Sequence, residues 1–465
     1  MQGAGQMSFY LIGIGGAGMS VVAELLHAKG EVVCGSDAKD SKNLDHLRSL
    51  GIEVFVGHDA AHVPADARVV ISTAVRESNP ELAIARERGQ EVLHRSQALA
   101  LAAKGMDFVA VAGAHGKTTS SGMLAAALSQ AGMDPSFAVG GVVTGFDTGA
   151  HLGASSVFVA EADESDKSFL NYSPRVALVT NVEPDHLDNY GSREEFEQTF
   201  LKFAQKIVPG GLLVVCSDDD GAARLGRAYE ELGGRVWSYG GLTEDEGLWR
   251  GRKHAVVSAA KLAPAHASAT VCFDGQETQL SLNVGGAHNL ENATGALLVG
   301  IELGVPMERM ATALHSFKGT GRRFELRGKA QGKVLVDDYA HHPSEVAAAL
   351  RQARVESGGG RVLVLFQPHL YSRTKTFATE FAKAFQLADR LYITDIFGAR
   401  EDPVEGVTSQ LISNQVPGAH YIPDMREAAQ AIANEAREGD LVITMGAGSI
   451  TSMGEVILNR WGASK

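Results

Sequence analysis

Apolar runs alternate with helical patterns through the first hundred residues. Phe9–Ile14, Glu31–Cys34 and Ala67–Ser72 are short apolar runs that predict strands, and Met19–Ala28 between the first two predicts a helix. Continuous apolar strands separated by helices are typical of a parallel sheet covered on both faces. The pattern therefore predicts a doubly wound, Rossmann-like domain over residues 1–104.

A second domain is expected over residues 105–318. Four further continuous apolar runs predict buried parallel strands, at Asp107–Val111, Ser156–Ala160, Val176–Thr180 and Leu212–Val215. The stretch 236–285 is more polar, and its shorter alternating runs predict an antiparallel extension of the same sheet.

A third domain is expected over residues 319–465, beginning near Gly319-Thr-Gly-Arg-Arg. Its predicted strands are Lys333–Asp337, Arg361–Leu365, Arg390–Thr394 and Asp440–Thr444, with a helix at Glu345–Val355. The fold class is thus α/β, with three domains, each built on a mainly parallel doubly wound sheet: Rossmann-like in the first and third, and of the phosphate-loop type in the centre.

Length and charge agree with this picture and exclude some partners. The 465 residues suffice for three domains at ~150 residues each. A net charge of −13 gives no general attraction to nucleic acid or to anionic lipid. Cys34, Cys216 and Cys272 are too scattered for a disulfide framework or a zinc site. With no basic leader and no apolar run of membrane-spanning length, we expect a cytoplasmic protein without membrane insertion.

The strongest chemical signal is Gly113-Ala114-His115-Gly116-Lys117-Thr118-Thr119, which follows an apolar strand and precedes a helical segment. This order of strand, glycine loop and helix is that of a phosphate-binding loop. Backbone N–H groups and the helix dipole favour an anion there. Lys117 adds a positive charge for the outer phosphates, and the Thr118 hydroxyl suits Mg²⁺. The alternative is a tight structural turn.

Two neighbouring strands of this domain also end in polar motifs. One runs into Glu161-Ala-Asp163-Glu164-Ser-Asp166 and the other into Asn181-Val-Glu-Pro-Asp185-His186. Ligands bind beyond the carboxyl ends of parallel strands, so we expect Thr118, Glu161 and His186 to converge on a metal site. Histidine is an unusual Mg²⁺ ligand, which indicates a second site or tolerance of Mn²⁺. The alternative is a pair of solvated acidic loops.

The first domain opens with Gly13-Ile-Gly15-Gly16-Ala-Gly18-Met19, a G-x-G-x-x-G pattern between strand and helix, and Asp37 follows 19 residues after Gly18. NAD, a nucleotide-sugar diphosphate and a plain tight turn all use this pattern. The ATP loop in the next domain disfavours hydride chemistry but does not choose among the remaining ligands.

The third domain carries Asp337-Asp338-Tyr339-Ala-His341-His342-Pro343 and Phe366-Gln-Pro368-His369-Leu370-Tyr371-Ser-Arg373 after two of its strands. The histidines suit proton transfer, and the planar guanidinium of Arg373 suits a carboxylate. A His-His-Pro run is also a common helix start, which is the alternative interpretation.

Eight motifs in order resemble the Mur ligase family along essentially the whole chain. They are Gly13–Met19, Gly113–Thr119, Glu161–Asp166, Asp185-His186-Leu-Asp188, His288-Asn289 with Asn292, Arg322-Arg323-Phe324, Asp337–Pro343 and Phe366-Gln-Pro-His369. Together they are far more specific than any one of them. The resemblance is greatest to the members that join L-alanine to UDP-N-acetylmuramate, an ATP-dependent step in making peptidoglycan precursors.

The resemblance implies a set of site residues. UDP-N-acetylmuramate would lie on Gly15, Gly16, Gly18, Met19, Asp37 and Ser72. ATP would be held by Gly113, Ala114, His115, Gly116, Lys117, Thr118, Thr119, His288, Asn289, Asn292, Arg323 and Asp338. His341, His369 and Arg373 would face L-alanine, and Thr118, Glu161 and His186 would surround Mg²⁺ or Mn²⁺. The catalytic group would be Lys117, His186, His341 and Arg373, in a monomer or a homodimer.

Two positions depart from patterns found in the family. Leu370 stands where an Arg often follows Gln-Pro-His, and Phe200 stands where later-acting ligases carry a modified Lys. The rival interpretations are a ligase that attaches a preformed tripeptide to the same sugar nucleotide, a non-catalytic nucleotide-sugar sensor, and an NAD-dependent oxidoreductase.

Overall fold

The computed structural model describes residues 7–184, 190–241, 252–399 and 401–462. Three sheets form its framework, and the chain divides into two compact units. Unit 1 comprises Met1–Val257, Val271–Thr278 and Asn292–Ser316, and unit 2 comprises Ser258–Thr270, Gln279–Glu291 and Phe317–Lys465. Among the described residues, no helix has both the length and the apolar character needed to cross a membrane.

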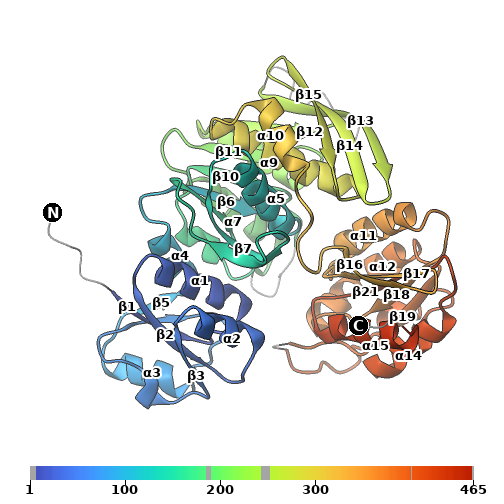
Figure 1. Cartoon of the computed structure of the whole chain (residues 1–465), viewed down its shortest axis with the longest axis horizontal. Helices are drawn as coiled ribbons and strands as arrows, with labels where there is room; N and C mark the ends of the chain where they lie inside the picture. Colours follow the sequence, from blue (N-terminus) through green and yellow to red (C-terminus); the bar gives the residue numbers. More distant parts are fainter. Residues whose placement is uncertain (1–6, 185–189, 242–251, 400, 463–465) are drawn as a thin grey trace. The chain divides into compact units, whose positions relative to one another are not determined.

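The first sheet has five parallel strands in the order β3-β2-β1-β4-β5 (Figure 1). They are β1 Ser8–Ile12, β2 Val32–Asp37, β3 Glu53–Val56, β4 Arg68–Ile71 and β5 Val92–His94. The helices are α1 Ala17–Ala28, α2 Lys42–Ser49, α3 Pro80–Glu87 and α4 Arg95–Ala102. The strand order reverses direction at β1, so a crevice opens at the carboxyl ends of the central strands.

The second sheet has ten strands in the order β15-β14-β13-β12-β11-β10-β6-β9-β7-β8. They are β6 Asp107–Ala112, β7 Ser136–Val143, β8 Thr148–His151, β9 Val157–Glu161, β10 Val176–Val179, β11 Leu212–Cys216, β12 Val236–Gly240, β13 His254–Ala263, β14 His266–Phe273 and β15 Gln276–Leu282. The helices are α5 Lys117–Gln130, α7 Arg193–Ala204, α8 Asp220–Glu231, α9 Ala287–Glu302 and α10 Met307–Leu314. The strands β9 and β10 pair with β6 on its two sides, both in parallel, so their carboxyl ends meet at one edge.

The third sheet has six strands in the order β16-β17-β21-β18-β19-β20. They are β16 Glu325–Ala330, β17 Lys333–Asp338, β18 Val362–Phe366, β19 Arg390–Ile393, β20 His420–Tyr421 and β21 Leu441–Met445. The helices are α11 Pro343–Glu356, α12 Tyr371–Phe385, α13 Gln410–Ser413, α14 Met425–Glu435 and α15 Met453–Arg460. Only the edge strand β16 runs antiparallel to its neighbour.

The α/β class with mainly parallel sheets is confirmed, and the differences from the sequence prediction concern strands near the sheet edges and the 236–285 extension. The antiparallel strands β8 and β16 were not predicted, because each is short or mostly exposed and lacks a continuous apolar run. In the 236–285 extension, β12 and β13 pair in parallel, contrary to expectation. The next two connections are two residues long, which only antiparallel neighbours permit.

Phe200, which stands at the position of the modified Lys in later-acting ligases, lies in the apolar core. Phe200 on α7 is fully buried, and its ring centroid lies 5.2 Å from that of Phe169 and 5.1 Å from that of Phe196. Lys202, two residues on, is exposed. Position 200 therefore carries a core packing residue in this chain rather than a modified lysine.

Candidate active site

The loop from β6 to α5 has a backbone that only glycine allows at two positions. Gly116 precedes α5 with φ +80°, and a Cβ there would lie 2.7 Å from Asn292 Oδ1. Gly113 has φ +135°, and a Cβ there would lie 2.2 Å from Thr180 Oγ1. The first N–H groups of α5 have no acceptor within the helix, as at every helix start. The loop thus places unpaired donors next to Lys117, which begins α5.

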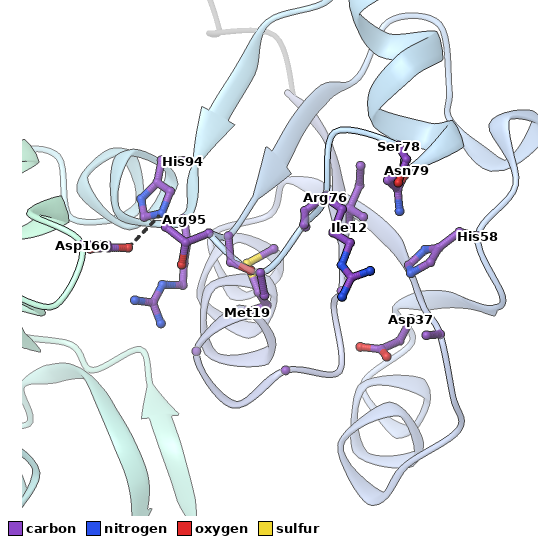
Figure 2. Close-up of a pocket in the computed structure, with 18 of the residues that line it drawn as sticks. Ile12, Met19, Asp37, His58, Arg76, Ser78, Asn79, His94, Arg95 and Asp166 are labelled. Carbon is purple, nitrogen blue, oxygen red and sulfur yellow. Dashed lines mark ion pairs between the residues drawn. The ribbon is translucent and has the colours of Figure 1, made fainter. Parts of the chain in front are cut away.

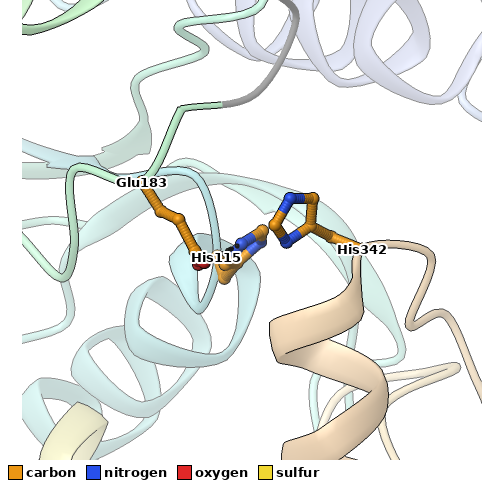
Figure 3. Close-up of side chains that lie close together, drawn as sticks. All are labelled: His115, Glu183 and His342. Carbon is orange, nitrogen blue, oxygen red and sulfur yellow. Dashed lines mark hydrogen bonds and ion pairs between the residues drawn. The ribbon is translucent and has the colours of Figure 1, made fainter. Parts of the chain in front are cut away.

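Residues that follow β10 hold this loop through hydrogen bonds. Asn181 Oδ1 accepts a hydrogen bond from His115 N (2.9 Å), and Asn181 Nδ2 donates to His115 O (3.0 Å). Thr180 Oγ1 also donates to His115 O, at 2.6 Å. The His115 ring lies beside Glu183, with Nε2 3.0 Å from Oε2 (Figure 3). The loop is therefore held rigidly from the neighbouring strand, as the convergence of strand ends predicts.

Lys117 is held by a carboxylate that the sequence analysis did not assign. Its Nζ donates to Glu164 Oε2 at 2.7 Å and to the carbonyls of Gly113 (2.5 Å) and Ala114 (3.1 Å). Burial raises the pKa of the Glu164 carboxyl to about 7, although Lys117 opposes that shift. Burial disfavours the ammonium, but the charges of Glu164, Asp163 and Glu161 outweigh it and raise the pKa of Lys117. The lysine is therefore kept charged at the phosphate loop.

Two of the three predicted metal ligands lie among the described residues. Glu161 ends β9 opposite Val111 of β6, and its Oε1 accepts a hydrogen bond from Gly140 N at 2.7 Å. Thr118 lies in the first turn of α5 and is buried. His186 falls in 185–189, outside the described residues. Carboxylate and hydroxyl oxygens are ligands that Mg²⁺ prefers, so the two described residues fit that ion.

The first glycine loop borders a cavity of about 760 Å³. Of the predicted sugar-nucleotide residues, Gly16, Gly18, Met19, Asp37 and Ser72 line it (Figure 2). Gly15 is not part of the lining. Its N–H donates to Asp37 Oδ2 at 3.0 Å, so Asp37 also holds the loop in place.

Several lining residues were missed from the sequence, because no motif marks them. They are His58, Arg76, Asn79 and Arg95. Asp163, Ser165 and Asp166 also line the cavity, and they belong to the acidic motif after β9, which was not assigned to this ligand. The Arg95 guanidinium lies over Gly18, where a Cβ would be 2.1 Å from Nη1, and its Nη2 lies 3.2 Å from Asp163 Oδ2. His94 Nε2 lies 3.4 Å from Asp166 Oδ2 (Figure 2).

The acidic loop 163–166 therefore joins two sites of unit 1. Asp163, Ser165 and Asp166 form part of the cavity wall, while Glu164 between them binds Lys117. Tyr190 OH donates a hydrogen bond to the Glu164 carbonyl. A ligand in the cavity thus lies against the same loop that holds the phosphate-loop lysine.

Three predicted residues of the third domain lie together. Arg373 is buried in the first turn of α12, and its Nη1 lies 3.1 Å from His369 Nδ1. The rings of His341 and His369 pack edge to face with centroids 5.8 Å apart. Leu370 has φ +71° and a buried side chain, so an apolar residue occupies a strained backbone position in front of α12. Leu370 therefore adds no second positive charge to that of Arg373.

A second predicted group of unit 2 surrounds the end of β17. Asp338 accepts hydrogen bonds from Phe324 N (2.8 Å) and Ala340 N (2.7 Å). Burial raises the pKa of Asp338 to about 6, although the Arg323 charge and these N–H donors oppose the shift. Burial, with the Arg323 charge acting in the same direction, lowers the pKa of His288 to about 4. His288 is therefore neutral at physiological pH.

Family comparisons cover all three parts of the chain. The model described as Mur ligase family, catalytic domain, matches residues 8–106, the Mur ligase middle domain matches 111–300, and the Mur ligase glutamate ligase domain matches 322–448. The chain belongs to the Mur ligase family. Mur ligases are ATP-dependent enzymes, which agrees with the phosphate loop at Gly113–Thr119.

Similar Mur ligases have been named in other organisms. The UDP-N-acetylmuramate–L-alanine ligase of Kineococcus radiotolerans is 49% identical over 97% of this chain and 95% of its own length. That of Renibacterium salmoninarum is 48% identical over 97% and 95%. The crystal structure of the UDP-N-acetylmuramate–alanine ligase of Thermotoga maritima has a TM-score of 0.81 at 27% identity and covers 99% of this chain and 100% of that one.

In this Mur ligase, the predicted residues fall into clusters that can be described one by one. The phosphate loop, Glu161 and Asn292 meet in unit 1, where Ser120 Oγ donates to Asn292 Oδ1 at 3.1 Å. His341, His369 and Arg373 meet in unit 2, as do Arg323, Asp338 and His288. Asn289 lies on the same helix as Asn292, α9, and its Nδ2 donates to Gly285 O at 2.6 Å.

Proposed function

We propose that this Mur ligase joins L-alanine to the lactoyl carboxylate of UDP-N-acetylmuramate in peptidoglycan precursor synthesis, with ATP converted to ADP and phosphate. The observation that carries the proposal is the acidic loop 163–166. It forms part of the wall of a cavity on the first glycine loop and binds the phosphate-loop lysine through Glu164. A sugar-nucleotide carboxylate and the γ-phosphate of ATP would therefore meet across one short loop.

The first chemical step is the attack of the lactoyl carboxylate on the γ-phosphate, which forms an acyl phosphate and releases ADP. Both reactants are anionic, so positive charge has to offset their repulsion. Lys117, kept protonated by its acidic neighbours, supplies that charge at the phosphate loop. Thr118 and Glu161 would hold a Mg²⁺ ion, which would further neutralise the phosphates.

The second step is the attack of the neutral alanine amine on the acyl carbon, which forms the amide and releases phosphate. We assign the alanine carboxylate to Arg373 and the acceptance of the amine proton to His341. Arg373 offers two parallel N–H donors to a carboxylate. The His341 ring packs against His369, which itself contacts Arg373, so the base and the carboxylate ligand belong to one cluster.

The domains take corresponding roles in the proposal. Residues 1–104 bind the sugar nucleotide, residues 105–318 bind ATP and residues 319–465 bind the amino acid. Further ATP contacts are assigned to His288, Asn289, Asn292, Arg323 and Asp338. A neutral His288 can accept as well as donate a hydrogen bond, which suits an adenine or ribose edge better than a phosphate.

Phosphate release from ATP tests the proposal when UDP-N-acetylmuramate is supplied with L-alanine, L-serine, glycine or a preformed tripeptide. We expect release with L-alanine and a new amide product by mass spectrometry. Turnover with the tripeptide but not with L-alanine would point to the peptide-recycling ligase instead. Absence of turnover with every amine, despite binding of both nucleotides, would favour a sensor.

Removal of the Asp37 side chain should weaken sugar-nucleotide binding without slowing chemistry. We expect Asp37→Ala to raise the KM for UDP-N-acetylmuramate about tenfold with little change in kcat, as loss of uniform binding does. Asp37→Asn is the matched control, because its amide oxygen can still accept the Gly15 N–H bond. An unchanged KM in both variants would show that the first glycine loop has a structural role only.

The KM for ATP should depend on pH through Asp338. The carboxyl is ionised above a pKa of about 6 and neutral below it, so its attraction for a nucleotide donor is lost as the pH falls. At one unit below the pKa only about a tenth of the groups remain charged. We expect the KM for ATP to rise up to about tenfold from pH 7.5 to pH 5. Asp338→Asn should flatten this part of the profile, and an identical profile in both proteins would refute the assignment.

A further inference from the structure

Glu81 is a fully buried carboxylate that the proposed mechanism does not use. It lies in the first turn of α3, which Asn79 caps through bonds to the N–H groups of Glu81 and Leu82. Tyr10 OH donates to its Oε1 at 2.7 Å, and Asp59 N donates to the same oxygen at 3.2 Å. Burying a carboxylate costs free energy unless neighbouring groups donate hydrogen bonds to it or carry an opposite charge. The full burial of Glu81 therefore indicates a specific role.

The other oxygen of Glu81 faces a histidine. Ser36 Oγ donates to Oε2 at 2.6 Å, and His58 Nδ1 lies 2.9 Å from the same Oε2 and 2.9 Å from Ser36 Oγ. The single hydroxyl proton of Ser36 is directed to Glu81, so Nδ1 faces acceptors only. A ring nitrogen in that position carries the proton, and Nε2 offers a lone pair whenever the ring holds this one proton alone.

His58 lines the cavity on the first glycine loop (Figure 2). It follows β3, and Asp37 ends the adjacent strand β2, opposite Val56 at the end of β3. In glycine-loop folds of this kind the pyrophosphate lies at the loop and the acidic residue after the second strand marks the ribose. His58 therefore lies on the nucleoside side of Asp37. A diphosphate offers acceptors only, whereas a uridine offers donors at the base N3–H and at the ribose 2′- and 3′-hydroxyls.

We propose that Glu81 is a positioning residue that keeps the proton of His58 on Nδ1, so that Nε2 accepts a hydrogen bond from the uridine of the sugar nucleotide. The inference rests on the proposed function, because it takes the ligand of this cavity to be a uridine diphosphate. The His58–Glu81 pair then selects for a nucleoside that presents a donor at this point. Glu81 itself does not touch the ligand.

The substitution Glu81→Gln tests the proposal by exchanging the donor and acceptor nitrogens of the His58 ring. Tyr10 and Asp59 both donate to the Oε1 position, so the amide oxygen belongs there and the amide NH₂ faces Ser36 and His58. The NH₂ group donates to Nδ1, which moves the ring proton to Nε2. Tyr10→Phe is the matched control, since it removes a donor from the same buried carboxylate without facing His58.

The experiment measures binding of UDP, N3-methyl-UDP, 2′-deoxy-UDP and 3′-deoxy-UDP to the full chain by calorimetry. In the unsubstituted protein we expect one analogue to bind about tenfold more weakly than UDP. A penalty on N3-methyl-UDP identifies the base, and a penalty on 2′-deoxy-UDP or 3′-deoxy-UDP identifies the ribose. The penalty should disappear in Glu81→Gln and in His58→Ala and persist in Tyr10→Phe.

Several results would overturn the inference. They are equal binding of all four ligands by the unsubstituted protein, a penalty that survives Glu81→Gln, and a penalty that Tyr10→Phe removes as well. Failure of the unsubstituted protein to bind UDP would refute the proposed function along with it. If Glu81→Gln does not fold, ¹⁵N NMR of the unsubstituted protein decides, because its ring nitrogen shifts report the tautomer directly. A proton on Nε2 alone would refute the assignment.

Discussion

Lys117→Ala should lose amide formation while its affinity for UDP-N-acetylmuramate stays close to normal. Lys117 lies at the phosphate loop of the central domain, whereas the glycine loop that borders the cavity proposed for the sugar nucleotide belongs to the first. Removing one well-placed electrostatic donor costs ~2.7–4 kcal/mol, or about a hundred- to a thousandfold in kcat. Product formation by mass spectrometry and calorimetry with UDP-N-acetylmuramate measure the two quantities.

The structure indicates that this substitution also lowers stability, so stability has to be measured separately from activity. Without Lys117, the buried Glu164 loses its cation, and breaking a buried ion pair on one side costs about 3–5 kcal/mol of stability. The double variant Lys117→Ala/Glu164→Gln should recover stability in urea unfolding without recovering activity. Lys167→Ala is a matched control, because Lys167 lies three residues after Glu164 and pairs with Glu195. Near-normal turnover of Lys117→Ala would refute the assignment of the loop.

Arg373→Lys should raise the KM for L-alanine about ten- to a hundredfold, with the KM values for ATP and the sugar nucleotide nearly unchanged. A carboxylate in a buried site needs a charged partner, and a guanidinium offers two parallel bonds where an ammonium offers a point charge. The effect should be large here because Leu370, which stands at the position of a frequent family Arg, is apolar and buried. Steady-state kinetics with each substrate varied in turn measures the three constants.

The same variant should retain the first chemical step. We expect slow, alanine-independent release of ADP to persist in Arg373→Lys, since acyl-phosphate formation does not involve the amino acid. Arg351→Lys, at an exposed position of α11, is the control for a conservative change in the same domain. Unchanged alanine saturation, or loss of ADP formation before alanine is needed, would refute the assigned role of Arg373.

The sequence alone predicted the framework because its signals are local. Continuous apolar runs such as Val176–Val179 predict buried parallel strands, and Gly-Lys-Thr after a strand predicts a phosphate loop. Parallel strands also bring their carboxyl ends to one edge, so the meeting of Gly113–Thr119 with Glu161 and Asn181 followed from the order of motifs. The group of His341, His369 and Arg373 was implied by the family resemblance, and these residues follow the ends of β17 and β18, which lie on either side of β21.

Only the tertiary structure decided which side chains pair across these edges. The acidic motif offers four carboxylates within six residues, and nothing in their spacing indicates that Glu164 binds Lys117 while Asp163 meets Arg95. The pairing of Glu81 with His58 joins residues 23 positions apart that carry no motif. Such contacts depend on loop conformation and on burial, which set the cost of leaving each charge unpaired. Periodicity and spacing place the strands and their loops, but the three-dimensional packing chooses the partners.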